Sequence, residues 1–175
     1  MIVIVFGLPG SGKSYFAERL AKVLDSVYLS SDRVRKEVLK EKDYSLKAKR
    51  MVYKRMIERG KEALRTGQTV VFDGTFFLKS IREMFCKNFN HHSTIHYIEV
   101  LASKTLIKER TTKKRIDSDA DYEIHKKIKR AFQPMSGPHL KLISTDKNLS
   151  EMIGSALKHL RLKERNDTKR YTFTA

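Results

Sequence analysis

The stretch GLPGSGKS near the start of the chain constrains the fold more than any other part of the sequence. It fits the pattern G-x-x-x-x-G-K-[ST], with Gly7, Gly12, Lys13 and Ser14 at the required positions. The apolar run Ile2–Phe6 precedes it and an amphipathic helical pattern follows it, so the context is strand, tight loop and helix. Such a loop is typical of a site that binds the phosphates of a nucleotide.

Each part of this phosphate-binding loop has an expected role. The glycines allow a tight turn that directs backbone N–H groups at phosphate oxygens. Lys13 is expected to reach the β- and γ-phosphates, and the Ser14 hydroxyl is expected to bind Mg²⁺. The residues expected to bind nucleotide are Gly7, Leu8, Pro9, Gly10, Ser11, Gly12, Lys13 and Ser14. No N-K-x-D guanine-recognition motif occurs, and STDKN after the last expected strand is not one, so ATP is the predicted nucleotide.

Strand and helix patterns alternate along the whole chain, which predicts an α/β fold with a five-stranded parallel sheet covered by helices on both faces. The expected strands are residues 2–6, 27–30, 69–73, 95–101 and 140–144. The expected helices are residues 13–24, 32–39, 45–66, 79–90, 105–113, 122–132 and 149–164. In the helix over 45–66, the apolar positions include Met51, Val52 and Met56. We expect one domain over residues 1–164 and a C-terminal tail over 165–175.

The stretch LSSDRVR, at the end of the second expected strand and just after it, places a carboxylate and a guanidinium group beside the phosphate-binding loop. Asp32 is positioned to accept the proton of an acceptor hydroxyl. Arg35, three residues later, lies on the same face of the helical turn and is predicted to bind an anionic acceptor or the carboxylate itself. The alternative is that Ser31 or Asp32 serves only as a helix N-cap.

The third expected strand ends in TVVFDGT, and its acid is a second candidate site residue. Asp73 is expected to hold Mg²⁺ through water or to orient neighbouring site residues. Thr75 is expected to contact the acceptor or Asp32. The alternative for this stretch is an ordinary turn at the end of a strand.

The stretch LIKERTTKKRIDSDAD has the composition of a mobile segment that brings arginines over a triphosphate. Arg110 and Arg115 are the predicted contacts, and Lys113 and Lys114 lie between them. A solvated, charged helix face is the alternative interpretation of each of these residues.

Composition limits the setting and the partners of the protein. The formal net charge is +17 over 175 residues, which favours a polyanionic partner such as nucleic acid or, alternatively, reflects solubility and ATP binding. The single cysteine, Cys86, excludes a disulfide scaffold and favours a reducing compartment. No apolar run approaches the ~20 residues of a membrane span, so a cytoplasmic protein without a membrane partner is expected. The sequence predicts no particular oligomeric state.

With these motifs together, the chain resembles the predicted P-loop kinases, often labelled AAA-family ATP-binding proteins, that are similar to phage polynucleotide 5′-kinase and to zeta-toxin-type kinases. The resemblance covers about residues 1–160 and runs through GLPGSGKS, YLSSDRVRKEV, GQTVVFDGTFFLKSIRE, the ERTTKKR…SDAD segment and QP. It implies a three-layer P-loop nucleoside-triphosphate hydrolase fold of the nucleotide-kinase type, with a helical lid over about residues 110–133. In polynucleotide kinases an Asp-x-x-Arg supplies the general base and an acceptor-binding arginine, which correspond to Asp32 and Arg35. Lid arginines that contact ATP correspond to Arg110 and Arg115.

The sequence therefore predicts an ATP-dependent kinase that uses Mg²⁺ and an alcohol group as acceptor. A polynucleotide 5′-OH and a small metabolite, such as a nucleotide sugar, are the two leading acceptors. A rival of another class is a regulatory ATPase or nucleic-acid-binding module that has the phosphate-binding loop but no acceptor. The pairing of Asp32 with Arg35 argues against this rival.

Overall fold

The first strand, β1 (Ile2–Phe6), is apolar at every position because helices cover both of its faces. All five of its side chains are fully buried. In this computed structural model, which describes residues 1–39, 43, 45–89, 94–112 and 122–160, β1 is the central strand of a five-stranded sheet. The strand order is β2-β3-β1-β4-β5, and every neighbouring pair is parallel. The predicted α/β fold with a five-stranded parallel sheet is confirmed.

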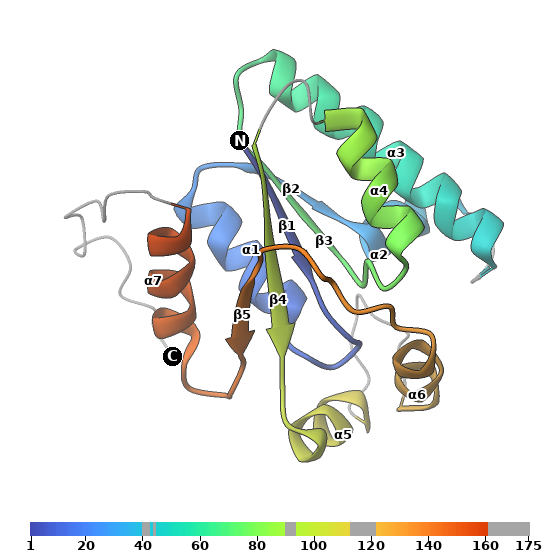
Figure 1. The fold of residues 1–175 in the computed structure, drawn as a ribbon, viewed down its shortest axis with the longest axis vertical. Coiled ribbons are helices and arrows are strands. Elements are labelled where there is room, and N and C mark those ends of the chain that lie inside the picture. Colours follow the sequence, from blue (N-terminus) through green and yellow to red (C-terminus); the bar gives the residue numbers. More distant parts are fainter. Residues whose placement is uncertain (40–42, 44, 90–93, 113–121, 161–175) are drawn as a thin grey trace.

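The elements follow the alternation of the sequence pattern (Figure 1). After β1, the strands are β2 (Val27–Ser30), β3 (Val70–Gly74), β4 (Ile95–Leu101) and β5 (Leu140–Ile143). The helices are α1 (Lys13–Val23), α2 (Ser31–Val38), α3 (Leu46–Arg65), α4 (Lys79–Phe89), α5 (Lys104–Thr112), α6 (Tyr122–Arg130) and α7 (Leu149–His159). The predicted boundaries differ from these mainly at helix ends, where the periodic pattern continues after the last helical turn.

The alternation of side chains along β1 divides the core into two layers. Ile4 and Phe6 point to the face that α3 and α4 cover, where they pack with Phe72 and Phe85. Val5 points to the other face, covered by α1 and α7. This arrangement is the three-layer architecture that the resemblance implied, and it fixes the carboxyl ends of the strands at one edge of the sheet.

The apolar residues of α3 do not all face the sheet. Val52 and Met56 are fully buried, but Met51 is 44 % exposed. The buried stripe of α3 runs through Ala48, Val52 and Met56, and Met51 lies one residue to the side of it, so it faces away from the sheet.

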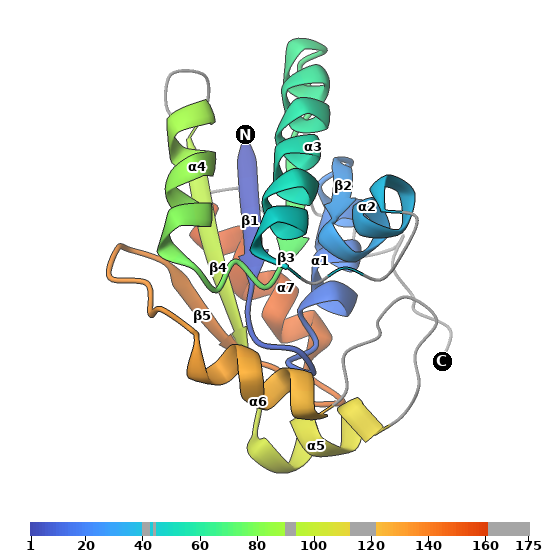
Figure 2. The same cartoon turned by 90° about the vertical axis from the view of Figure 1, so that its right-hand side faces the viewer.

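Helices α5 and α6 lie together beyond the carboxyl ends of the strands, apart from the helices that cover the sheet (Figure 2). Helix α6 and the last residues of α5 fall within the predicted lid over about residues 110–133, whereas most of α5 precedes it. In the part of the chain that the structure describes, no helix is long and apolar enough to cross a membrane.

Candidate active site

Three neighbouring strands end at the same level, and this edge carries the predicted site residues. Ser30 at the end of β2 is in register with Asp73 on β3, and Asp73 is in register with Val5 on β1. The phosphate-binding loop begins immediately after β1, and α2 begins immediately after β2. Parallel pairing therefore brings the loop, Asp73 and the first turn of α2 together, although they are far apart in the sequence.

The loop has the backbone conformation that its glycines were expected to provide. Gly10 and Gly12 have φ angles of +84° and +89°, in the left-handed region that favours glycine. Gly12 is also the N-cap of α1 and makes no side-chain capping bond, so the first N–H groups of the helix stay available to a ligand. Ser11 Oγ is buried and has no hydrogen-bond partner among the described residues. An orphaned hydroxyl and open N–H groups fit a phosphate site.

The opposite side of the loop packs closely against its surroundings. A Cβ on Gly7 would lie 2.3 Å from the backbone oxygen of Val100, which leaves no space for a side chain. A Cβ on Gly10 would lie 2.8 Å from Thr111 Cγ2 on α5. Both glycines are therefore required by close packing, against β4 and the lid respectively.

Asp73 is the buried acid at the centre of this edge, with an exposure of 1 %. Its Oδ2 accepts a hydrogen bond of 2.8 Å from the Tyr28 hydroxyl, whereas its Oδ1 has no partner among the described residues. Burial raises the pKa of Asp73 above its usual value, and Lys13 and the hydroxyls of Ser14 and Tyr28 oppose this rise. The charge of Asp32 adds to this rise of the pKa.

This environment fits the Mg²⁺ site that the sequence predicts. Mg²⁺ typically takes one or two protein oxygens, and phosphate oxygens and water complete its coordination. Asp73 Oδ1 is an orphaned buried oxygen, and the neighbouring Ser14 supplies a hydroxyl. A divalent cation here would favour the charged form of a carboxyl group that burial disfavours.

Asp32 lies inside the first turn of α2, not at its cap. The N-cap of α2 is Ser30, and the N-cap interpretation of Ser31 or Asp32 is therefore wrong. Arg35 follows one turn later, and its Nη1 donates to the backbone oxygen of Asp43 at 3.0 Å. The charges of both Asp32 and Arg35 act on Tyr53, so the two predicted residues lie on the same side of α2.

Thr75 is held by a turn that the sequence did not reveal. Phe76, the next residue, is fully buried with a φ of +42°, which is rare for an aromatic residue. Its N–H donates to the Tyr53 hydroxyl at 3.2 Å, and its oxygen accepts from Arg82 Nη1 at 2.7 Å. Tyr53 also contacts the side chain of Thr75. A Cβ on Gly74 would lie 3.0 Å from both Ser31 Oγ and the Tyr53 hydroxyl, so α2 and α3 close tightly on this turn.

Arg110 lies against the phosphate-binding loop and the turn after β5. Its guanidinium donates to the backbone oxygen of Ser11 at 3.3 Å and to Ser144 Oγ at 3.1 Å. It also donates to the Thr145 oxygen and pairs with Asp146 at 2.8 Å. Arg110 therefore lies against the loop, whereas Arg115 lies outside the described residues.

His125 of α6 forms a second contact between the lid and the loop. This side chain is 4 % exposed, and its Nδ1 lies 2.9 Å from the backbone oxygen of Pro9. A carbonyl oxygen only accepts, so Nδ1 must carry the proton. The His125 ring stacks on Tyr122 with centroids 5.7 Å apart.

The segment after α6 is attached to the turn after β3. Gln133 N donates to the Phe77 oxygen at 2.9 Å, and Arg82 Nη2 donates to the Gln133 oxygen at 2.8 Å. Arg82 and Gln133 belong to stretches that carried the family resemblance, which was the only signal for them. Tyr28, Tyr53 and His125 had no signal in the sequence, since their partners are distant along the chain.

Comparison with known proteins agrees with this arrangement. Residues 2–135 match a family model described as AAA domain. A gluconokinase from Sinorhizobium meliloti 1021 is 16 % identical, with a TM-score of 0.69 over 91 % of this chain and 90 % of that one. The APS kinase CysC of Mycobacterium tuberculosis, in complex with AMPPNP and APS, is 18 % identical, with a TM-score of 0.72 over 91 % and 96 %. Kti12 of Chaetomium thermophilum, in complex with ADP-AlF3, is 16 % identical, with a TM-score of 0.65 over 91 % and 98 %.

These likenesses show that the chain has the fold of P-loop kinases. The family model spans most of the chain, from β1 through the phosphate-binding loop, Asp32, Asp73 and Arg110 to the segment after α6. The protein therefore belongs to the AAA-domain family of P-loop proteins, as its sequence motifs indicated.

Proposed function

We propose that this protein is an ATP-dependent kinase that transfers the γ-phosphoryl group to a hydroxyl acceptor. The observation that carries the proposal is the position of Asp32, a carboxylate in the first turn of α2 directly after β2, whose charge acts on Asp73 beside the phosphate-binding loop. Asp32 and Arg35 supply the groups that a hydroxyl acceptor requires.

The site residues divide into those that hold the nucleotide and those that act on the acceptor. Gly7–Ser14 bind the phosphates through backbone N–H groups, and Lys13 neutralises the β- and γ-phosphates. Ser14 and Asp73 would hold Mg²⁺, which when bound neutralises charge on the phosphate oxygens. Arg110, which hydrogen-bonds to Ser11 and pairs with Asp146, is proposed as the lid arginine that contacts ATP.

On the acceptor side of the site, Asp32 is the proposed general base. Its carboxylate takes the proton of the acceptor hydroxyl as that oxygen bonds to the γ-phosphorus, while the bond to the β–γ bridging oxygen breaks and ADP leaves. Arg35 and Thr75 orient the acceptor, and Arg115 is proposed as a further lid contact. Lid helices that contact the loop at Gly10 and Pro9 would exclude water during this step.

Two classes of acceptor are supported, one by the charge of the protein and the other by its structural neighbours. A polynucleotide 5′-OH is favoured by the net charge of +17 and by the basic α6, which carries Lys126, Lys127, Lys129 and Arg130. A small metabolite or nucleotide sugar is favoured by structural neighbours named as a gluconokinase and an APS kinase. We place the protein in the cytoplasm, where ATP is available.

Transfer of labelled γ-phosphate tests the proposal. The protein is incubated with Mg²⁺ and γ-labelled ATP, and with 5′-OH oligonucleotides, nucleosides, sugars or sugar acids in separate reactions. We expect label on one acceptor class, and none with Lys13→Ala, because this variant loses its phosphate contact. ATP hydrolysis that no acceptor stimulates would instead support the regulatory ATPase.

A further inference from the structure

Three cations from separate helices gather beside the acceptor side of the site. Lys49 belongs to the second turn of α3, Arg35 to α2 and Lys127 to α6. Burial lowers the pKa of Lys49, and the positive charges of Arg35 and Lys127 lower it further. Like charges are normally kept apart on a folded surface, so this arrangement requires an explanation.

Lys49 lies on α3 close to the residues that are proposed to bind the acceptor. Lys49 precedes Tyr53 by four residues, so both side chains lie on one face of α3, about 6 Å apart at their Cβ atoms. Tyr53 contacts Thr75, and the charges of Asp32 and Arg35 act on the pKa of its hydroxyl group. The face of α3 that touches the acceptor residues therefore continues, one turn away, into Lys49.

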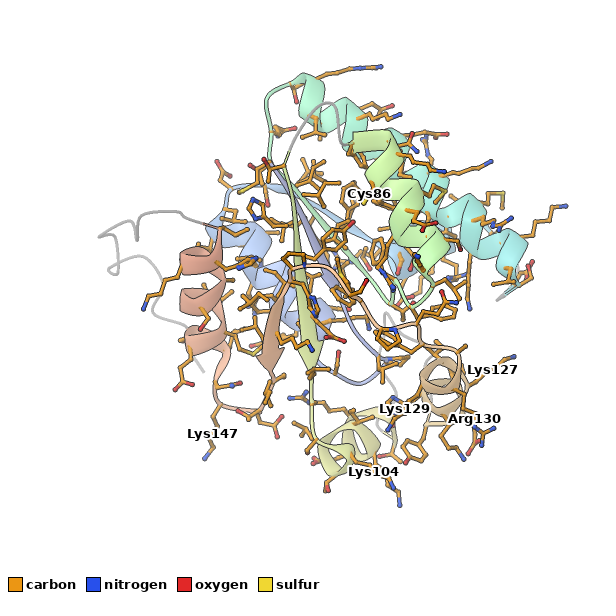
Figure 3. All side chains as sticks on the ribbon, in the orientation of Figure 1. Cys86, Lys104, Lys127, Lys129, Arg130 and Lys147 are labelled. Atoms are coloured by element: carbon orange, nitrogen blue, oxygen red, sulfur yellow. The ribbon has the colours of Figure 1, made fainter. Side chains whose placement is uncertain are left out.

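An aromatic ring fixes the Lys49 ammonium group. Its Nζ lies 4.5 Å from the centroid of the Phe77 ring, and Phe77 is 5 % exposed. Phe77 also accepts a hydrogen bond from Gln133, just after α6, so the start of α3 and the end of the lid meet at this residue. Figure 3 shows Lys127 extending from α6 on the side of the molecule where α3 begins. Lys129 lies on the opposite side of α6, toward α5.

Neither lysine is neutralised within the part of the chain that the structure describes. No carboxylate there forms an ion pair with Lys49 or Lys127, although the neighbouring Lys126 pairs with Glu123. A half-buried ammonium group that is repelled by two other cations costs free energy, and an anion between them would remove that cost.

We propose that the acceptor is an alcohol that carries an anionic group, and that Lys49 and Lys127, with Arg35, bind this group. This inference rests on the proposed kinase function and narrows its substrate class. The hydroxyl lies at Asp32 and Thr75, and the phosphate or carboxylate of the same molecule lies toward α6. Lys127 of α6 would contact this anionic group, so that an anionic acceptor completes the site.

Equilibrium dialysis with labelled sulfate tests the anion site without knowledge of the acceptor. The phosphate-binding loop is first filled with saturating AMPPNP and Mg²⁺, and ionic strength is held constant with chloride. We expect Lys49→Met and Lys127→Met each to weaken sulfate binding by about tenfold. The matched control Lys129→Met removes the same charge from the same helix and should bind as the wild type does. Equal sulfate affinity in all four proteins, or none in the wild type, would overturn the proposal.

Acceptor pairs that differ in charge extend the test to turnover. Cytidine 3′-monophosphate is compared with cytidine, and gluconate with glucose, which separates a phosphate from a carboxylate as the anionic group. We expect the anionic member of at least one pair to have a KM about tenfold lower, and Lys127→Met to remove that difference. Lys127 is exposed, so this variant serves even if Lys49→Met fails to fold.

The kinase function and the anion site would be contradicted by different results. Specific sulfate binding without transfer to any hydroxyl would leave the anion site standing and contradict the kinase function. Transfer that does not distinguish anionic from neutral acceptors would leave the kinase function standing and contradict the anion site.

Discussion

Asp73 is the single residue in which burial, charge and the proposed chemistry of this protein meet. It is 1 % exposed, it accepts a hydrogen bond from Tyr28, and one of its oxygens has no partner among the described residues. Burial disfavours the charged form of this carboxyl group more than Lys13 and Ser14 favour it. An acid in such a position costs the folded protein free energy, which a bound cation would offset.

We predict that Asp73→Asn stabilises the nucleotide-free protein at neutral pH and weakens Mg²⁺-dependent nucleotide binding. Because the folded-state pKa of Asp73 is raised above 3.8, its contribution to stability is fully present below that pH and is lost as the pH rises through the folded-state pKa. Urea unfolding at a series of pH values should therefore show an advantage of the variant that grows with pH. An advantage that shrinks as the pH rises would contradict the assignment.

At the level of elements, the turn after β3 determines where Thr75 points. Phe76 adopts a positive φ, and the Tyr53 hydroxyl and Arg82 hold its backbone from two helices. The Tyr53, Phe76 and Phe85 rings pack together beneath this turn. The strained turn is thus maintained by side chains from α3 and α4, which lie on either side of it in the sequence.

We expect Tyr53→Phe to lower the free energy of unfolding by about 1–3 kcal/mol, because the buried N–H of Phe76 loses its hydrogen-bond partner. The turnover rate should fall as well, since Thr75 loses its contact with the same hydroxyl. Tyr15→Phe is the matched control, because Tyr15 is 59 % exposed, and should change stability by less than about 0.5 kcal/mol. Equal stability of the two variants in urea unfolding would argue against this role of Tyr53.

The contact between His125 of α6 and the phosphate-binding loop can also be tested by substitution. His125→Ala should lower kcat/KM for ATP by roughly three- to tenfold, because α6 loses its hydrogen bond to Pro9. His125→Asn should recover part of the loss, since an asparagine amide can donate from nearly the same position as Nδ1. Steady-state kinetics over a range of ATP concentrations measures both variants. Equal impairment of the two would mean that the ring fills space and does not position the loop.

The elements were easier to predict than the contacts between them. GLPGSGKS, the alternating pattern and the acids after the second and third strands act over short stretches, so the strands, the loop, Asp32 and Asp73 could all be located from the sequence. Tyr28, Tyr53 and His125 act through partners 45, 23 and 116 residues away, which only the sheet order brings near. Met51, one of the apolar positions of the predicted helix over 45–66, is exposed, because an apolar residue one position beside the buried stripe faces away from the sheet.

For the molecule as a whole, the net charge of +17 is the property that bears on the partner. If a polynucleotide is the acceptor, its binding should release counterions, and the logarithm of the affinity should fall with the logarithm of salt concentration by about 0.7 per phosphate contacted on a single strand. Fluorescence titration of a 5′-OH oligonucleotide at several salt concentrations measures this slope. A slope near zero would favour a small anionic acceptor, with which the cluster of Arg35, Lys49 and Lys127 is also compatible.

In the proposed phosphoryl transfer, Asp32 deprotonates the acceptor hydroxyl. The most direct measurement is single-turnover transfer of γ-labelled phosphate to the acceptor identified by screening, with wild type and Asp32→Asn compared at saturating ATP. We expect that the variant still binds ATP but transfers phosphate about 10²- to 10⁴-fold more slowly, because the amide cannot accept the proton. Transfer by Asp32→Asn at a rate near that of the wild type would contradict the claim.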